Sequence, residues 1–203
     1  MNKAKIAVFV SGGGTNLQAI IDKAAAGGIP HGELAVVVSS KAGAYALERA
    51  AKANISGRVV SKKDAGSQDA FEAQLLAVLD EYKIDMIILA GFMSILTKNF
   101  TDRYPQRIIN VHPALIPSFC GEGFYGLRVH EAALSYGVKV TGATVHFVNE
   151  IPDGGQIIAQ KAVDVLPGDT PEVLQKRVME QAEWLLLPQA AEIVAADLVA
   201  NNK

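Results

Sequence analysis

The 203-residue sequence has little cysteine, little net charge and no long apolar run. Its single cysteine, Cys120, excludes an intramolecular disulfide framework and a cysteine-rich metal site. The formal net charge of −2 argues against a nucleic acid or a membrane surface as the main partner. The apolar run at 6–10 is too short for a signal peptide, and no segment approaches the ~18–20 apolar residues of a membrane span. We therefore expect a soluble cytoplasmic protein.

Half of the residues are hydrophobic, and short apolar runs alternate with helical patterns along the chain. The runs predict strands at 6–10, 34–39, 58–61, 84–90, 107–112, 140–148 and 156–165. The helical patterns cover 16–25, 44–53, 68–82, 97–104, 127–136 and 170–199, and Pro188 should kink or divide the last of these helices.

The strand patterns change along the chain and indicate the fold class. The early runs are continuously apolar, as in a parallel sheet that is covered on both faces. The later segment VTGATVHFVNE alternates and is followed by a turn and QIIAQKAVDV, which predicts an antiparallel hairpin. We expect one α/β domain over 1–203: an open, mostly parallel, Rossmann-like sheet flanked by helices, with a C-terminal antiparallel hairpin at the sheet edge.

The segment KIAVFVSGGGTNLQAI reads as a strand, a glycine-rich turn and a helix. Glycines let backbone N–H groups approach an anion at the helix N-terminus, where the helix dipole favours negative charge. A Walker loop would need a lysine, and a dinucleotide fingerprint would need a third glycine where Leu17 stands. We interpret Gly14, Thr15 and Asn16 as binding a phosphate monoester; the alternative is a tight turn without a ligand.

The segment RIINVHPALIP places polar side chains at the end of an apolar strand. Residues on a strand alternate between its faces, so Asn110 and His112 point the same way. An amide and an imidazole side by side at a strand end are more typical of a site than of a core.

Three further features are open to a functional or a structural interpretation. The strand end LAGFMSIL, 89–96, could hold a flat organic ring or simply pack as a loop. Asp153 lies in a Pro-Asp-Gly-Gly turn, which by itself explains an aspartate. His146, on the penultimate strand, is by itself more typical of a structural histidine.

Together these segments resemble the glycinamide ribonucleotide formyltransferase (phosphoribosylglycinamide formyltransferase) family, the folate-dependent enzymes of purine biosynthesis. The matching stretches follow in order through nearly the whole chain: VSGGGTNLQAI, LAGFMSIL, INVHPALIP, GATVHFVNEIPDGGQIIAQ and RVMEQAEWLLLP. The resemblance implies transfer of a formyl group from the co-substrate 10-formyltetrahydrofolate to the amine of glycinamide ribonucleotide. It implies no metal and no nucleic-acid or membrane partner, and we expect a monomer or a homodimer.

The resemblance also implies roles for individual residues, with the phosphate site in about 1–105 and the folate and catalytic site in about 106–203. Asn110, His112 and Asp153 would form the reaction centre. Apart from the resemblance, we expect Thr144 to position a water there and His146 to support the centre. A cis peptide before Pro117 is implied beside them. Residues implied in ribotide binding are Gly13, Gly14, Thr15, Asn16 and Glu183. Residues implied in folate binding are Phe92, Met93, Ser94, Ile95, Leu96 and Ile151, together with Asn110 and Asp153.

The sequence departs from the family pattern in three places. Ser94 stands where many relatives have arginine, so that side chain is unavailable to the folate. The segment at 118–134 is longer than in some relatives. The interval between Val178 and Glu183 is also longer, by one residue.

Other functions remain as alternatives. A methionyl-tRNA formyltransferase would carry a C-terminal RNA-binding domain and a formyltetrahydrofolate deformylase an extra N-terminal domain, and we expect neither in this chain. A non-catalytic nucleotide- or folate-binding module would need the glycine loop but not Asn110, His112 and Asp153 together.

Formyl transfer passes through a tetrahedral carbon whose oxygen gains negative charge. We expect Asn110 and a protonated His112 to donate hydrogen bonds to that oxygen. We expect Asp153 to favour the imidazolium form of His112 and to relay protons through an ordered water.

Overall fold

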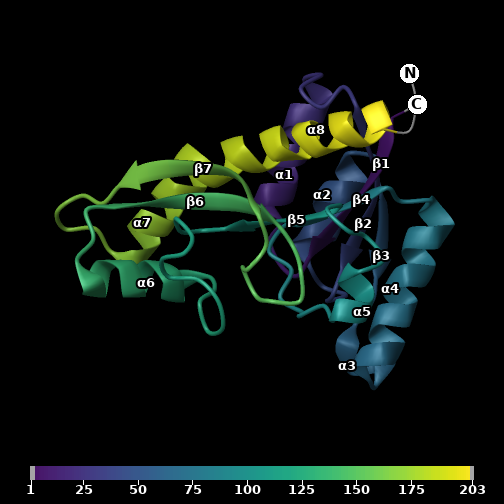
Figure 1. The fold of residues 1–203 in the computed structure, drawn as a ribbon, viewed down its shortest axis with the longest axis horizontal. Helices are drawn as coiled ribbons and strands as arrows, with labels where there is room; N and C mark the ends of the chain where they lie inside the picture. The colour runs from purple at the N-terminus through teal and green to yellow at the C-terminus, as the bar shows by residue number, and fades with distance from the viewer. Residues whose placement is uncertain (1–2, 202–203) are drawn as a thin grey trace.

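The computed structural model describes residues 3–201, which form a seven-stranded sheet with helices on both faces (Figure 1). The strand order is β3-β2-β1-β4-β5-β6-β7. Strands β1 to β5 pair in parallel, and β6 and β7 pair antiparallel with β5 and with each other. The strands are β1 Ala4–Val10, β2 Gly32–Ser39, β3 Ser56–Val59, β4 Met86–Leu89, β5 Ile108–His112, β6 Val140–Phe147 and β7 Ile157–Asp164. The expected mixed sheet with a C-terminal hairpin at its edge is confirmed.

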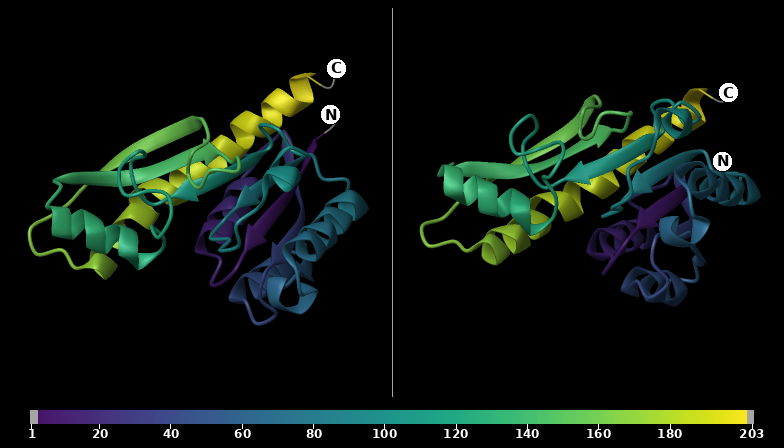
Figure 2. Two further views of the ribbon diagram at one scale, coloured as in Figure 1. Left: turned by 60° about the horizontal axis from the view of Figure 1, so that its bottom comes forward. Right: turned by 90° about the horizontal axis from the view of Figure 1, so that it is seen from below.

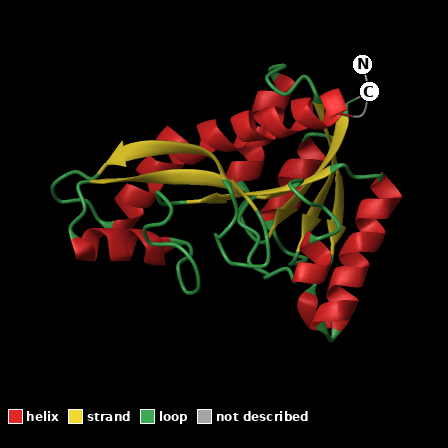
Figure 3. Ribbon diagram, viewed as in Figure 1, coloured by secondary structure: helices red, strands yellow, loops and turns green. Residues whose placement is uncertain are grey.

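The helices cover the sheet in two layers (Figures 1 and 3). Side chains of α1, α2 and α8 pack with one face of the strands, and side chains of α4 and α5 pack with the other. Buried on both sides, the parallel strands carry the continuous apolar runs seen in the sequence. The helices are α1 Thr15–Ala25, α2 Tyr45–Lys52, α3 Lys62–Ala65, α4 Gln68–Tyr82, α5 Lys98–Thr101, α6 Leu127–Tyr136, α7 Pro171–Val178, η1 Met179–Glu183 and α8 Trp184–Asn201.

The last helical segment differs from the single helix expected at 170–199. It consists of α7, the π-helical turn η1 and the long helix α8, which runs along the sheet (Figure 2). The division comes before Pro188, and α8 continues through that proline. Pro188 has no N–H to donate to the carbonyl of Trp184, the first residue of α8, so the bond lost lies at the start of the helix. The prediction that Pro188 itself divides the helix is therefore wrong in position.

The hairpin β6–β7 extends the sheet and carries the long connection at 148–156. Strand β6 is buried on both faces, because Ala143 and Val145 pack in the core beneath α8 while Thr144 and His146 face the loops on the other side. The short helix α3 was not expected from the sequence. No helix within residues 3–201 is long and apolar enough to cross a membrane.

Candidate active site

A cavity of about 900 Å³ lies at the carboxyl ends of the central strands. The strand order reverses between β1 and β4, which is where open α/β sheets bind ligands. The cavity is lined by segments 91–95, 110–113 and 121–126, and by single residues that include Asn16, His130, Asp153 and Glu183. Its size is in the range of small-molecule sites.

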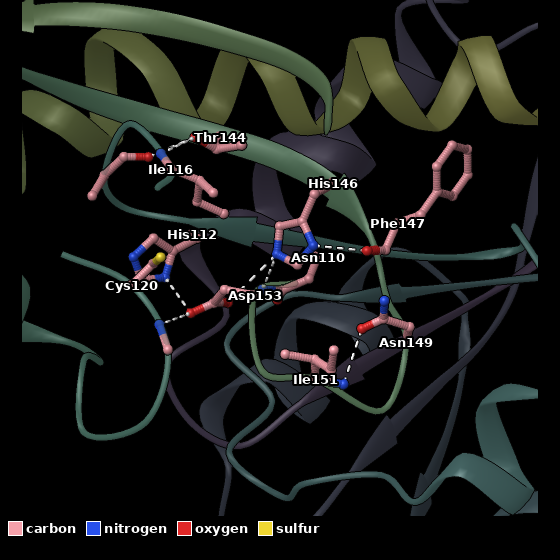
Figure 4. A network of polar contacts seen from close by, with 12 residues as sticks. Asn110, His112, Ile116, Cys120, Thr144, His146, Phe147, Asn149, Ile151 and Asp153 are labelled. Carbon is pink, nitrogen blue, oxygen red and sulfur yellow. Dashed lines mark hydrogen bonds and ion pairs between the residues drawn. The ribbon is translucent and has the colours of Figure 1, made fainter. Parts of the chain in front are cut away.

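Strand β5 and the β6–β7 connection bring three of the expected residues together (Figure 4). Asn110 and His112 lie on the same side of β5, opposite His146 and Thr144 of β6. Asp153 lies between two imidazole rings, with Oδ2 at 3.3 Å from Nδ1 of His112 and Oδ1 at 3.5 Å from Nε2 of His146. The backbone N–H of Gly121 also donates to Oδ2, at 2.9 Å.

The backbone at Asp153 is in the left-handed region, with φ of 56°. Aspartate and asparagine adopt this region more readily than most residues. The glycines that follow allow a close turn, because a Cβ at Gly155 would overlap the carbonyl of Phe147. The Pro-Asp-Gly-Gly sequence is therefore both a turn and the support that points the carboxylate at His112.

Burial sets the charge of the His112–Asp153 pair. Burial lowers the pKa of His112 below its usual value, and the carboxylate of Asp153 only partly opposes this. Burial alone would raise the pKa of Asp153, but the adjacent ring of His146, the charge of His112 and the Gly121 amide together lower it. Asp153 therefore favours the imidazolium form of His112, as expected, but the cost of burying the charge is larger, so the pKa of the ring stays below its usual value.

The contacts of the ring show where a proton is gained. Nε2 of His112 lies 2.8 Å from the carbonyl oxygen of Phe119, so we assign the proton of the neutral ring to Nε2. The lone pair on Nδ1 then faces the carboxylate of Asp153. A proton added to Nδ1 would convert this contact into a charge-assisted hydrogen bond, so the pair is arranged to take up one proton.

One of the two Nδ2 hydrogens of Asn110 is hydrogen-bonded to His146, and the other is not. Its Nδ2 lies 3.2 Å from Nε2 of His146, whose Nδ1 donates to the carbonyl of Phe147 at 2.8 Å. This chain fixes the tautomer of His146 and turns the Asn110 amide nitrogen toward it. The second hydrogen of Nδ2 remains available to an oxygen in the cavity.

We expected Thr144 to hold a water, but its hydroxyl is hydrogen-bonded to protein groups. Its hydroxyl donates to the carbonyl of Ala114 at 2.7 Å and accepts from the N–H of Ile116 and from Nε2 of Gln160. A hydroxyl has one hydrogen and two lone pairs, so none is left for a water. Thr144 instead holds the loop that contains the cis Ile116–Pro117 peptide, and the expected cis bond is present.

The glycine loop continues directly into α1. Gly14 has φ of 72° and precedes the first residue of the helix, Thr15. The loop is held from α2 by Arg49, whose Nε donates to the carbonyl of Gly13 at 2.8 Å. Arg49 was not predicted from the sequence, because nothing in its helical pattern indicates that it contacts a loop 36 residues away.

Of the residues expected to bind the ribotide, some line the cavity and others do not. Asn16 and Glu183 line the cavity and bind each other, with Nδ2 of Asn16 donating to Oε2 of Glu183 at 2.7 Å. Gly13, Gly14 and Thr15, which directly precede Asn16 in the chain, are not part of the cavity lining. Burial raises the pKa of Glu183 to about 7, although the hydrogen bond from Asn16 opposes this.

We expect Glu183→Gln to stabilise the protein at pH 8 and to have little effect at pH 5. The folded protein keeps the Glu183 proton up to about pH 7, whereas an unfolded glutamate loses it near its usual pKa of 4.5. Stability therefore falls as pH rises between these values, by up to about 3 kcal/mol for the raised pKa. Thermal melts should show the variant unfolding roughly 5–10 °C higher than the parent at pH 8.

The control for this change is Glu180→Gln, on the same helical turn but more exposed. It should melt like the parent at both pH values. An equal shift of the Glu183→Gln protein at pH 5 and pH 8 would mean that ionisation of Glu183 is not the cause.

The loop after β4 supplies an apolar wall to the cavity. The side chains of Met93 and Ile95 are more than half exposed and line it, as do Phe92 and Ser94. Leu96, expected here, is instead buried in the core beside α4 and α5. Ile151 is exposed outside the cavity lining, because the turn that directs Asp153 inward leaves the preceding apolar side chain in solvent.

His130 on α6 lines the same cavity and was missed in the sequence. It is fully buried, and neither ring nitrogen has a hydrogen-bond partner among residues 3–201. Burial, and then the nearby His112, lower its pKa to about 4. The one signal in the sequence was a histidine on the apolar face of a helix, next to Val129 and one turn before Ala133.

Comparison with known proteins identifies similar chains. The family model described as formyl transferase matches residues 4–190. The chain is 41% identical to the phosphoribosylglycinamide formyltransferase of Haemophilus influenzae, over 91% of this chain and 84% of that protein. A solved glycinamide ribonucleotide transformylase from Symbiobacterium toebii superposes with a TM-score of 0.89 at 42% identity, covering 96% of this chain and 89% of that one.

Some relatives are much longer than this chain. The trifunctional purine biosynthetic protein adenosine-3 of Gallus gallus is 44% identical over 98% of this chain, which spans 19% of that protein's length.

Proposed function

Because the chain belongs to the formyl transferase family, we propose that it transfers a formyl group from 10-formyltetrahydrofolate to the amine of glycinamide ribonucleotide. The products are formyl-glycinamide ribonucleotide and tetrahydrofolate, in purine biosynthesis. The observation that carries this proposal is the cluster of Asn110, His112 and Asp153 in one cavity. A binding module would need neither the buried histidine–carboxylate pair nor the amide beside it.

The two substrates would occupy different halves of the cavity. The ribotide phosphate would bind the backbone amides of Gly13, Gly14 and Thr15, and its ribose would reach Asn16 and Glu183. The folate ring would lie against the apolar wall formed by 92–95. The reacting carbon would then lie between the halves, beside Asn110 and His112.

The reaction forms one C–N bond and breaks another. The ribotide amine attacks the formyl carbon, and the free Nδ2 hydrogen of Asn110 stabilises the oxygen as it becomes negative. Both nitrogens of His112 face protein oxygens, so its main contribution is the positive charge that the His112–Asp153 pair gains with a proton. The proton lost by the amine passes to this pair, through a water, and a proton is returned to the folate nitrogen as the bond to carbon breaks.

The direct test is a formyl-transfer assay with the purified protein, glycinamide ribonucleotide and 10-formyltetrahydrofolate. We expect tetrahydrofolate and formylated ribotide to appear in equal amounts. Release of free formate without formylated ribotide would indicate a hydrolase, and binding without turnover would indicate a binding module.

We expect Gly14→Val to raise the KM for the ribotide about ten- to a hundredfold and to leave the KM for the folate nearly unchanged. A β-branched residue at a φ of 72° is strained by about 1–3 kcal/mol, and the new Cβ would lie 2.7 Å from Cβ of Ala46. The loop must then move away from α2, which displaces the amides that bind the phosphate. Steady-state kinetics with each substrate varied in turn measures both values.

The control for the glycine loop is Gly43→Val. A Cβ at Gly43 would meet nothing within 4 Å, so both KM values should stay at those of the parent. Equal increases for both substrates in the Gly14→Val protein would mean that the loop shapes the fold and does not bind the phosphate.

Compartment and assembly stay predictions from the sequence alone: a cytoplasmic protein, as a monomer or a homodimer. Sedimentation at micromolar concentration would distinguish the two assemblies.

A further inference from the structure

A buried carboxyl group on α4 contacts the loop after β4 that lines the cavity, but the carboxyl group is not itself part of the cavity lining. Glu72 is 5% exposed and lies on α4, which covers the face of the sheet opposite to α1, α2 and α8. Its Oε1 accepts from the N–H of Thr97 at 2.7 Å, and its Oε2 accepts from Oγ1 of Thr97 at 2.6 Å. These contacts join α4 to the residue where the loop after β4 ends and α5 begins.

Gln68 adds a second connection from the same helix. Its Nε2 donates one hydrogen to Oε1 of Glu72 at 2.6 Å and the other to the carbonyl of Ile95 at 3.1 Å. Glu72 thus receives three hydrogen bonds, and every one is given by the loop or by a side chain that also binds the loop. A buried carboxylate needs such donors. The carboxylate of Glu72 is therefore satisfied by hydrogen bonds from Thr97 and Gln68.

The loop held in this way is the apolar wall of the cavity. Its first part is anchored by Ser11, whose Oγ accepts from the N–H of Met93 at 3.0 Å. Leu96 is fixed in the core. Between these points the side chains of Met93 and Ile95 are exposed and line the cavity, and contacts from α4 hold the carbonyl of Ile95 and the N–H of Thr97.

We propose that Glu72, acting through Gln68 and Thr97, is a positioning residue for the formyl-folate co-substrate. The inference rests on the proposed function, since it assigns the wall at 92–95 to the folate. Glu72 does not touch the cavity, so its effect reaches the substrate only through the backbone of the loop. Within residues 3–201 the hydrogen bonds of Glu72 go to Gln68 and Thr97 and not to the glycine loop or Glu183, which should be unaffected.

The test uses Glu72→Leu, which keeps a side chain of similar size on α4 but removes both acceptor oxygens of the carboxylate. We expect the KM for 10-formyltetrahydrofolate to rise about tenfold, since releasing a hydrogen bond to a charged group changes an equilibrium by roughly that factor or more. The KM for the ribotide should stay within about twofold. Thr97→Val, which removes one of the bonds to Glu72, should raise the folate KM by a smaller factor in the same direction.

Conservative variants provide the rescue. Glu72→Gln keeps an acceptor for the Thr97 N–H and a polar partner for its hydroxyl, and Thr97→Ser keeps the hydroxyl, so both should remain close to the parent. The control is Glu81→Leu on the exposed side of α4, where the only ion pair is with Arg58 at the surface. It should change neither KM.

Melting temperature and kinetics together distinguish positioning from a structural role. A lower melting temperature with both KM values unchanged, or equal increases in both, would overturn the proposal. Binding of tetrahydrofolate to the same variants by calorimetry decides the question if the parent protein does not formylate the ribotide. In that case loss of folate affinity in Glu72→Leu alone supports the positioning role while the proposed function fails.

Discussion

Replacing Asp153 with asparagine is expected to reduce kcat at least as much as loss of an oxyanion donor, about 10²–10³-fold. The change removes the carboxylate that pairs with Nδ1 of His112 and the acceptor that takes a proton from the amine. Asparagine tolerates the left-handed backbone at this position, so the loop should keep its shape. The ribotide KM should be nearly unchanged, because Asn16 and Glu183 lie on other elements.

The pH dependence should change in the same variant. Without the carboxylate, burial of His112 is opposed less, so its pKa falls further below the usual value. The part of the pH–rate profile that reports the pair should therefore move to lower pH. The parent profile reports macroscopic pKa values of the pair and not of either residue alone.

A double-mutant cycle shows whether the pair acts as a unit. His112→Ala alone should also cost about 10²–10³ in kcat. The double variant His112→Ala with Asp153→Asn should cost little more than the worse single change, because the two groups act on one proton. If the two losses instead add in free energy, the residues act independently and the relay is wrong. Asp102→Asn and His31→Ala, both outside the cavity lining, are the controls and should leave kcat unchanged.

Asn110→Ala is the second change with a large expected effect, about 10²–10³ in kcat at nearly unchanged ribotide KM. Its free Nδ2 hydrogen is the donor that the structure leaves available for the formyl oxygen, and each such donor is worth roughly 3–4 kcal/mol in the transition state. Asn110→Asp should be at least as damaging, because it puts an acceptor where the oxygen becomes negative.

Single-turnover kinetics measures this loss without interference from product release. The matched control is Asn99→Ala on α5, outside the cavity lining, which should behave as the parent. A rise in the folate KM with kcat unchanged would assign Asn110 to ground-state binding and not to the transition state.

Local patterns predicted the sheet and the shared orientation of Asn110 and His112. Continuous apolar runs indicated the buried parallel strands, and the alternation in VTGATVHFVNE indicated the edge hairpin. Strand periodicity was enough to place Asn110 and His112 on one side of β5. These features depend on residues a few positions apart, which is the range over which sequence patterns are informative.

The features that the sequence did not predict depend on distant residues. The pKa of His112 is lowered by its burial, and no spacing in the sequence encodes how deeply a residue is buried. The hydroxyl of Thr144 is hydrogen-bonded to the loop at 114–116, which is distant from it in the sequence. Arg49 and Glu72 likewise hydrogen-bond to loops that are distant from them in the sequence. His130 is fully buried because α6 packs under the cavity, although its sequence neighbours only suggest an amphipathic helix.

The π-helical turn η1 explains how the last helix tolerates a change of length. An α-helix advances about 100° per residue, so one inserted residue would normally rotate every later side chain away from its partners. A wide turn holds one more residue than an α-helical turn and can absorb such an insertion locally. The resemblance to the family predicts one extra residue between Val178 and Glu183, and this is the segment that forms η1. Glu183 faces the cavity, and the buried side of α8 from Leu186 to Ala195 packs on the sheet. Evolution can therefore lengthen or shorten the chain at this point without redesigning either the ribose side of the cavity or the core beneath α8.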